Sequence, residues 1–283
     1  MKKKHYALIG HPIAHSMSSF IHKRLFELSK VDADYDLINI PIEDLSAAFN
    51  SLKELDGFNV TIPHKQIIIP YLDSLSKKAS LYRSVNLVKT VNEFSEGHTT
   101  DPDGFISALE FANIPLKGKV VILGAGGAAR AAAYESVLAG CETIISVRPQ
   151  SLTHAASLIG DIKSNTIAPQ ISSCTLESLK GEIDLLVNAT PVGTYPKIHE
   201  SPVFADTVKN CKAVFDMVYN PNETMLVKLA KSNGIKYSNG LSMLIWQAVY
   251  AQNIWTGAQF DCKDIKQLYI DTSTEMNKIF PVN

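Results

Sequence analysis

The sequence predicts an α/β protein with two domains and mostly parallel sheets. The chain has 283 residues, of which 46% are hydrophobic, which is long for one domain and suits two separate cores. Short apolar runs alternate with helical patterns, which is typical of βαβ units. A strand, a glycine-rich turn, a helix and a second strand follow one another in the second half, as in a dinucleotide-binding Rossmann domain.

Composition excludes several classes of partner. The formal net charge is -1, from 27 basic and 28 acidic residues, so no excess of charge favours nucleic acid or an acidic membrane surface. No window approaches the roughly 18 apolar residues of a membrane span, and the apolar run after Met1–Lys4 is too short for a signal peptide. The four cysteines lie far apart without a C-x-x-C spacing, which argues against a zinc site or a disulfide framework and fits a reducing cytoplasm.

The first predicted strand, residues 6–9, ends in a turn dense with hydroxyl groups. Helical spacing begins at Phe20, and Ser18 is a good candidate for the N-cap. Ser16 and Ser18 therefore lie at a strand-to-helix turn, where hydroxyls and backbone donors suit a carboxylate. The alternative is that both serines only cap the helix.

A further strand is predicted for residues 57–63, after a strand at 35–40 and a helix at 43–55. Apolar residues alternate there with Asn59 and Thr61, and Lys65 follows where a new helix begins at the Pro63–His64 pair. An amide, a hydroxyl and an ammonium group at one strand end can bind a hydroxylated small molecule and move a proton. The alternative is an edge strand followed by a surface lysine.

The next segment contributes two more polar candidates. Residues 67–82 are predicted as mostly helical with a break at Pro70, and residues 84–94 as a strand that contains Asn86. Asp101 is either the N-cap of the helix that follows or a functional carboxylate. In parallel α/β sheets ligands bind at the carboxyl ends of strands, and the polar groups named so far cluster at such ends.

The second domain is predicted to begin after a short polar joint at residues 113–119. The apolar strand 120–123 leads into a glycine turn and an alanine-rich helix, and the next strand is 143–147. Gly124 and Gly126 let the backbone approach a pyrophosphate, and Ala129 fills the third position of the fingerprint. Arg148 follows the second strand, where an acidic residue would bind the ribose hydroxyls of NAD. Because arginine pairs with a 2′-phosphate, it favours NADP.

Two further strands are predicted at residues 184–187 and 214–218, and each ends in a polar segment, residues 188–193 and 219–221. An apolar helix follows, in which Met243 and Gln247 share a face. A glutamine among buried apolar residues needs hydrogen-bond partners, which backbone groups or a ligand could supply.

Taken together, these segments resemble the shikimate dehydrogenase family along essentially the whole chain. The resemblance rests on eight motifs in the family's order: residues 15–18, 59–65, 85–86, 100–105, 124–130, 188–193, 215–221 and 240–247.

The resemblance implies a substrate-binding domain formed by residues 1–112 with 239–283, and a Rossmann domain at 113–238. It implies NADP-linked, reversible oxidation of shikimate at its C3 hydroxyl to 3-dehydroshikimate, a step of aromatic amino acid biosynthesis. It implies that Lys65 and Asp101 form the catalytic pair. The residues implied to bind substrate are Ser16, Ser18, Asn59, Thr61, Asn86, Tyr219 and Gln247. Those implied to bind the cofactor are Gly124, Ala125, Gly126, Gly127, Ala128, Arg148, Thr190, Val218, Gly240 and Met243.

The chemistry needs a group that accepts the hydroxyl proton while hydride leaves the same carbon. Burial favours a neutral Lys65, whereas a neighbouring Asp101 favours its charged form, so we assign the proton to the pair. Two alternatives stay open: a quinate/shikimate dehydrogenase that uses NAD or NADP, and a non-catalytic sensor that binds the dinucleotide or the acid. We expect a cytoplasmic monomer or homodimer that acts on a small molecule, without metal, nucleic acid or membrane partners.

Overall fold

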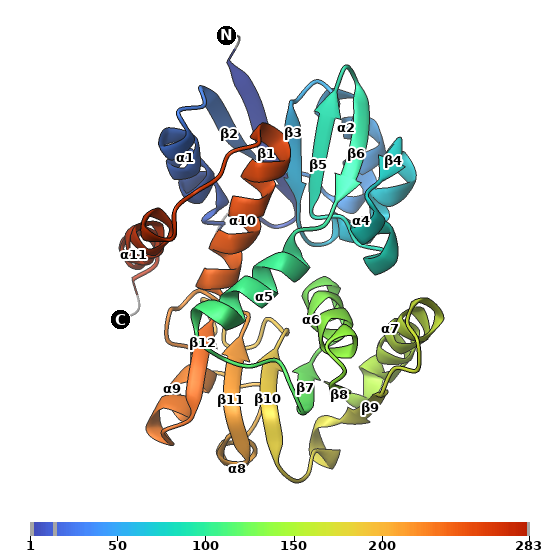
Figure 1. Ribbon diagram of the computed structural model, residues 1–283, viewed down its shortest axis with the longest axis vertical. Helices are drawn as coiled ribbons and strands as arrows, with labels where there is room; N and C mark the ends of the chain where they lie inside the picture. Colours follow the sequence, from blue (N-terminus) through green and yellow to red (C-terminus); the bar gives the residue numbers. More distant parts are fainter. Residues whose placement is uncertain (1–2, 14–15, 282–283) are drawn as a thin grey trace. The chain divides into compact units, whose positions relative to one another are not determined.

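The structure is a computed structural model that describes residues 3–13 and 16–281 (Figure 1). The chain forms two compact units, one of Met1–Gly104 with Ile245–Thr274 and one of Phe105–Leu244 with Glu275–Asn283. It passes from one unit to the other within α5 (Asp101–Phe111), α10 (Leu241–Thr256) and α11 (Cys262–Ile279). The predicted α/β class is confirmed, and the predicted boundaries at residues 113 and 239 stay a prediction.

The first unit is built on a six-stranded sheet in the order β2-β1-β3-β5-β6-β4. Its strands are β1 (Lys4–Gly10), β2 (Ala33–Asn39), β3 (Gly57–Val60), β4 (Ser74–Leu75), β5 (Leu87–Val91) and β6 (Phe94–His98). Its short helices are α1 (Ser18–Ser29), α2 (Leu45–Leu52), α3 (His64–Ile67) and α4 (Lys77–Tyr82), with 3₁₀ turns at Ile42–Asp44 and Ile69–Tyr71.

Strand β3 lies inside this sheet, not at its edge. It pairs in parallel with β1 and antiparallel with β5, and all four of its residues are buried. The interpretation of residues 57–63 as an edge strand is therefore wrong. A central position fixes the direction of every β3 side chain, because both rows of backbone groups are paired.

Two segments differ from their predicted form. Residues 84–94 form the end of a loop and then β5, which turns at Asn92 and Glu93 into β6. Both turn residues have positive φ, 50° and 63°, as a tight hairpin turn requires. Residues 67–82 are not one broken helix, because the Asp73 carboxylate accepts the Ser95 backbone N–H at 2.8 Å and β4 then pairs with β6.

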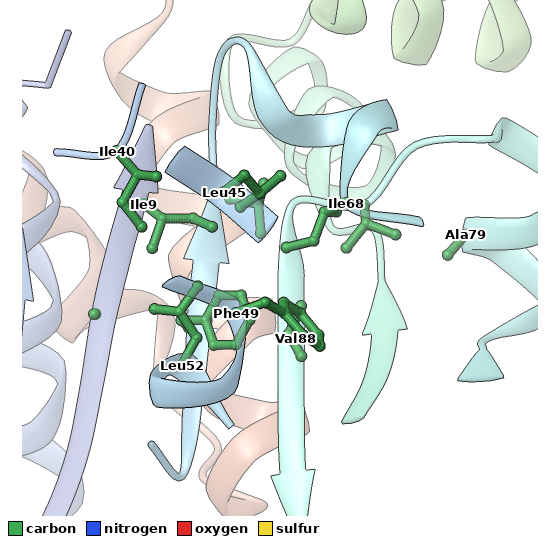
Figure 2. Close-up of a cluster of buried hydrophobic side chains, with 12 residues drawn as sticks. Ile9, Ile40, Leu45, Phe49, Leu52, Ile68, Ala79 and Val88 are labelled. Carbon is green, nitrogen blue, oxygen red and sulfur yellow. The ribbon is translucent and has the colours of Figure 1, made fainter. Parts of the chain in front are cut away.

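One hydrophobic cluster packs helix α2 onto this sheet (Figure 2). Leu45, Phe49 and Leu52 are spaced four and three residues apart, so they lie on one face of α2. That face meets buried residues of the strands, among them Ile9 and Val88. The cluster therefore joins α2 to the inner strands β1, β3 and β5 of this sheet.

The second unit contains a fully parallel sheet in the order β12-β11-β10-β7-β8-β9. Its strands are β7 (Lys119–Leu123), β8 (Glu142–Val147), β9 (Ile171–Thr175), β10 (Ile183–Asn188), β11 (Cys211–Asp216) and β12 (Lys236–Asn239). Its further helices are α6 (Gly127–Leu138), α7 (Leu152–Asn165), α8 (Ala205–Lys209) and α9 (Met225–Ser232). The first strand, β7, lies at the centre, so the order reverses between β7 and β10, as in the doubly wound dinucleotide-binding fold.

Within the described residues, no helix combines the length and the apolar character that a membrane crossing requires.

The start of β3 depends on a glycine packed under an indole ring. Trp255 donates its ring N–H to the Val88 carbonyl at 2.9 Å and stacks on Tyr6 with ring centroids 4.5 Å apart. A Cβ on Gly57 would overlap the Trp255 ring nitrogen and come within 2.7 Å of the Val88 oxygen. Glycine is therefore the residue that lets α10 pack on this strand.

We predict that Gly57→Ala lowers the free energy of unfolding by about 1–3 kcal/mol, because the added methyl group overpacks a filled site. Gly160→Ala is the control, since its Cβ would meet no atom within 4 Å and alanine favours a helix interior. Urea titration measures both variants. Equal stability of Gly57→Ala and wild type would contradict the packing described.

Candidate active site

Lys65 is held by the short helix that follows β3. Helix α3 begins at His64, whose buried ring contacts the Ile40 carbonyl oxygen through Nε2 at 2.7 Å. The Lys65 carbonyl accepts the Val85 backbone N–H at 2.8 Å. These contacts fix the Lys65 backbone beside the segment that carries Asn86.

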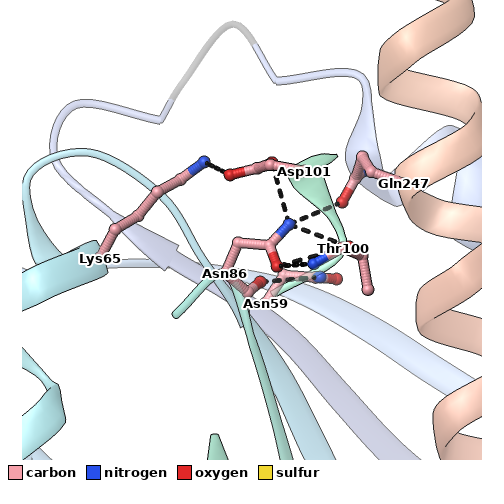
Figure 3. Close-up of polar contacts among 6 residues, drawn as sticks. All are labelled: Asn59, Lys65, Asn86, Thr100, Asp101 and Gln247. Atoms are coloured by element: carbon pink, nitrogen blue, oxygen red, sulfur yellow. Dashed lines mark hydrogen bonds and ion pairs between the residues drawn. The ribbon is translucent and has the colours of Figure 1, made fainter. Parts of the chain in front are cut away.

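The Lys65 side chain forms an enclosed ion pair with Asp101 (Figure 3). Lys65 Nζ lies 2.5 Å from Asp101 Oδ2, and the two side chains are 16% and 9% exposed. Asp101 is the first residue of α5, so it is both the start of a helix and an ion-pair partner. The surface-lysine interpretation of Lys65 is wrong.

Asn86 holds the other oxygen of the same carboxylate. Its Nδ2 donates to Asp101 Oδ1 at 3.0 Å and to Thr100 Oγ1 at 3.0 Å, while its Oδ1 accepts the Thr100 backbone N–H at 2.7 Å. A backbone N–H can only donate, so the orientation of this buried amide is determined. Both Asp101 oxygens therefore have donors, which fix the carboxylate opposite Lys65.

Two more predicted substrate residues join this network (Figure 3). Gln247 Oε1 lies 3.5 Å from Asn86 Nδ2, and Asn59 Nδ2 donates to the Asn86 carbonyl at 3.1 Å. Thr61 follows β3 and is partly exposed, with its backbone N–H bonded to the Ile9 carbonyl at 2.9 Å. The structure thus brings Lys65, Asp101, Asn86, Asn59 and Gln247 into one connected set of polar side chains.

The serine pair lies at the start of α1. Ser18 is the first residue of that helix, and Met17 is the N-cap, so the expectation that Ser18 caps the helix is wrong. The Ser16 hydroxyl accepts the Ser18 backbone N–H at 3.2 Å. Ser16 also donates to the Ser18 hydroxyl at 3.1 Å. The two hydroxyl groups therefore face each other at a helix start, as a carboxylate site would need. His15 of the same motif lies outside the described residues.

The glycine turn of the second unit fits a dinucleotide pyrophosphate. Gly124 has φ +101°, and a Cβ there would lie 3.1 Å from Thr190 Cγ2, in the loop that follows β10. Gly126 precedes α6 and faces open space, and α6 has neither a side-chain cap nor an acidic residue in its first turn. The N–H groups of that turn, including those of Gly127 and Ala128, suit an anion.

The predicted nucleotide discriminator lies at the end of β8. Arg148 is exposed and forms no ion pair within the part of the chain that the structure describes. Its backbone precedes the 3₁₀ turn Pro149–Ser151. An exposed guanidinium at this strand end suits a 2′-phosphate.

Asp216 is a hub that the sequence did not single out. It is fully buried at the end of β11, and its carboxylate accepts from Asn188 Nδ2 at 2.9 Å, the Val218 N–H at 3.0 Å and the Thr224 hydroxyl at 2.6 Å. Burial raises the pKa of Asp216 to about 6, although these three donors act in the opposite direction. Asn188 Oδ1 in turn accepts both the backbone N–H and the hydroxyl of Thr190.

Val218 connects Asp216 to Gly240, another predicted cofactor residue. The Val218 carbonyl accepts the Gly240 N–H at 3.2 Å, and any Cβ on Gly240 would overlap the Met217 carbonyl. Met243 is buried in the first turn of α10. Tyr219 follows Val218 in the second unit, so its place at the substrate site stays a prediction. No group of three or more potential metal ligands occurs among the described residues.

The sequence of this chain is similar to those of known proteins. Residues 8–88 match the family described as the shikimate dehydrogenase substrate binding domain. The chain is 38% identical over 263 residues to the shikimate dehydrogenase (NADP(+)) of Caldanaerobacter subterraneus subsp. tengcongensis, which covers 91% of this chain and 93% of that protein.

Solved structures of shikimate 5-dehydrogenases are also similar to this chain. The chain is similar to shikimate 5-dehydrogenase from Thermus thermophilus in complex with NADP(H) and shikimate, with a TM-score of 0.85 and 33% identity over 95% of this chain and 99% of the other. It is also similar to shikimate 5-dehydrogenase from Listeria monocytogenes in complex with shikimate and NAD, with a TM-score of 0.84 and 31% identity over 94% and 96%.

The raised pKa of Asp216 predicts a pH dependence of stability. The folded chain holds this proton more tightly than the unfolded chain, whose carboxyl has an ordinary pKa, so the contribution of Asp216 falls as pH rises from about 4 through about 6. We predict that the unfolding free energy of wild type minus that of Asp216→Asn decreases by about 1 kcal/mol between pH 5 and pH 7. Urea titrations at both pH values measure it, and a constant or increasing difference would contradict the burial argument.

Proposed function

Because the chain belongs to the shikimate dehydrogenase family, we propose that it catalyses the reversible, NADP-dependent oxidation of shikimate at C3 to 3-dehydroshikimate. The relatives are NADP-dependent enzymes of this name, and the glycine turn and Arg148 of this chain suit that nucleotide. The reverse direction makes shikimate for aromatic amino acid biosynthesis.

The observation that carries the proposal is the enclosed pair of Lys65 and Asp101, 2.5 Å apart at the end of a central strand. In the oxidative direction the C3–H bond breaks with its electron pair and the C3–O–H bond loses a proton. NADP supplies the hydride acceptor. Lys65 Nζ takes the hydroxyl proton while Asp101 holds the lysine in place, and in the reductive direction the same group returns the proton to the ketone oxygen.

The neighbouring side chains bind and orient the acid. Ser16 and Ser18 hold its carboxylate. Five further residues surround its ring hydroxyl groups and carboxylate: Asn59, Thr61, Asn86, Tyr219 and Gln247. This role is supported by the network that ties Asn59, Asn86 and Gln247 to the ion pair. A site built from hydrogen-bonding groups discriminates against analogues that lack a hydroxyl, because buried partners are then left unpaired.

A second candidate function uses the same residues but accepts a broader range of acids and nucleotides. The Listeria relative was solved with NAD, so we propose a quinate/shikimate dehydrogenase that accepts NAD as the alternative. The reaction in either case takes place in the cytoplasm on a small molecule, in a monomer or a homodimer, which sedimentation velocity would distinguish.

We predict that Lys65→Ala and Asp101→Asn each lower kcat on the order of 10²- to 10⁴-fold with shikimate and NADP, and that the double variant loses little more, because the two groups act as a unit. Lys78→Ala is the matched control. Lys78 Nζ lies 2.5 Å from Asp103, also in the first turn of α5, but these side chains are 41% and 31% exposed. Steady-state kinetics measure all four variants. A Lys65→Ala enzyme as active as Lys78→Ala would exclude Lys65 as the proton-transfer group.

Initial rates with shikimate and quinate, each with NADP and NAD, decide the substrate and the nucleotide. We expect the highest kcat/KM for shikimate with NADP. Arg148→Ala should raise the KM for NADP about tenfold or more, the value of a lost charged hydrogen bond, and leave the KM for NAD unchanged. Equal kcat/KM values with both nucleotides would favour the second candidate, and inactivity on both acids would favour a non-catalytic sensor.

A further inference from the structure

Behind Asn59 lies a tyrosine that the site described above does not use. Tyr35 is on β2, at the edge of the first sheet, and its side chain reaches across β1 to β3. Its hydroxyl donates to Asn59 Oδ1 at 2.7 Å. Asn59 is only 4% exposed, so the orientation of its side-chain amide is set by neighbouring protein groups and not by solvent.

The hydrogen bonds of Asn59 leave a defined remainder for a ligand. An asparagine side chain offers two N–H donors and two acceptor lone pairs. One N–H is bound to the Asn86 carbonyl, which can only accept, and one lone pair is occupied by Tyr35. The His22 ring also lies within hydrogen-bonding range of Asn59, so the second lone pair is taken up inside the protein. One N–H is left, which suits the oxygen of a single ligand hydroxyl group.

Tyr35 is itself fixed in the role of donor. Burial raises the pKa of its hydroxyl well above the ordinary value, so the group stays protonated, and Ser18 forms a hydrogen bond to the same hydroxyl. The His22 ring stacks on the Tyr35 ring, with centroids 4.3 Å apart and an angle of 9° between the planes. Burial lowers the pKa of His22 to about 3, so no charge develops beside the phenol near neutral pH.

We propose that Tyr35 is a positioning residue for substrate specificity, which turns the Asn59 amide so that it binds one hydroxyl group of the acid. Tyr35 acts through Asn59 and does not touch the reacting atoms. This inference rests on the proposed function, since it assigns Asn59 to the acid, but it concerns binding of the acid and not transfer of the proton.

Tyr35→Phe tests the inference, because it removes the hydroxyl and keeps the ring that stacks on His22. We expect the KM for shikimate to rise about fivefold, the value of a neutral hydrogen bond, with the KM for NADP unchanged and kcat altered less than twofold. Tyr6→Phe is the matched control: Tyr6 stacks on Trp255 in the same aromatic cluster, and its hydroxyl bonds to no residue that the structure describes. It should leave the KM for shikimate within twofold of wild type.

A double-mutant cycle separates positioning from general stability. In an Asn59→Ala background the amide is gone, so adding Tyr35→Phe should raise the KM for shikimate less than twofold further. A fivefold effect in both backgrounds, or an unchanged KM in the single variant, would overturn the inference while wild-type turnover still supports the proposed function. A wild-type protein that neither oxidises nor binds shikimate, by kinetics and by calorimetry, would overturn both.

Discussion

The enclosed pair of Lys65 and Asp101 is the interaction on which the first unit is organised. Placing a lysine and an aspartate largely out of water costs free energy unless both are well paired. The fold provides this pairing from three directions: β3 and α3 carry Lys65, the start of α5 carries Asp101, and Asn86 bonds to the second carboxylate oxygen. A central strand is suited to this task, because its register cannot slip without exposing its apolar face.

The second unit contains a buried carboxylate, Asp216, that is stabilised by neutral donors. None of the hydrogen bonds described for it comes from a lysine, arginine or histidine. Asp216 takes its donors from Asn188, Val218 and Thr224, and these belong to the exits of two neighbouring strands and to the N-cap of α9. Through Asn188 the hub also fixes Thr190 beside the glycine turn. Asp216 therefore links the two loops that carry Thr190 and Val218, directly to Val218 and through Asn188 to Thr190.

The sequence alone predicted the strand ends and the chemistry gathered there, because period-two alternation and glycine turns are local signals. The strand–turn–helix at Gly124–Gly127 and the polar exit of β3 follow from such signals. What could not be predicted depends on contacts between distant segments. Asp73 bonding to Ser95 converts part of an expected helix into β4. Pairing of β3 with both β1 and β5 makes it a central strand. Tyr35 and Asp216 were missed for the same reason: a tyrosine on an apolar strand and an aspartate at a strand end carry no local mark of their partners.

We propose that Lys65 moves a proton and does not merely supply a positive charge. Chemical rescue of Lys65→Ala tests it most directly, by measuring NADP reduction with shikimate as small amines are added. We predict that methylamine restores turnover in a saturable way, because it can accept the proton. Tetramethylammonium should not restore turnover, because it carries a charge but cannot accept or donate a proton. Equal rescue by both compounds would contradict it.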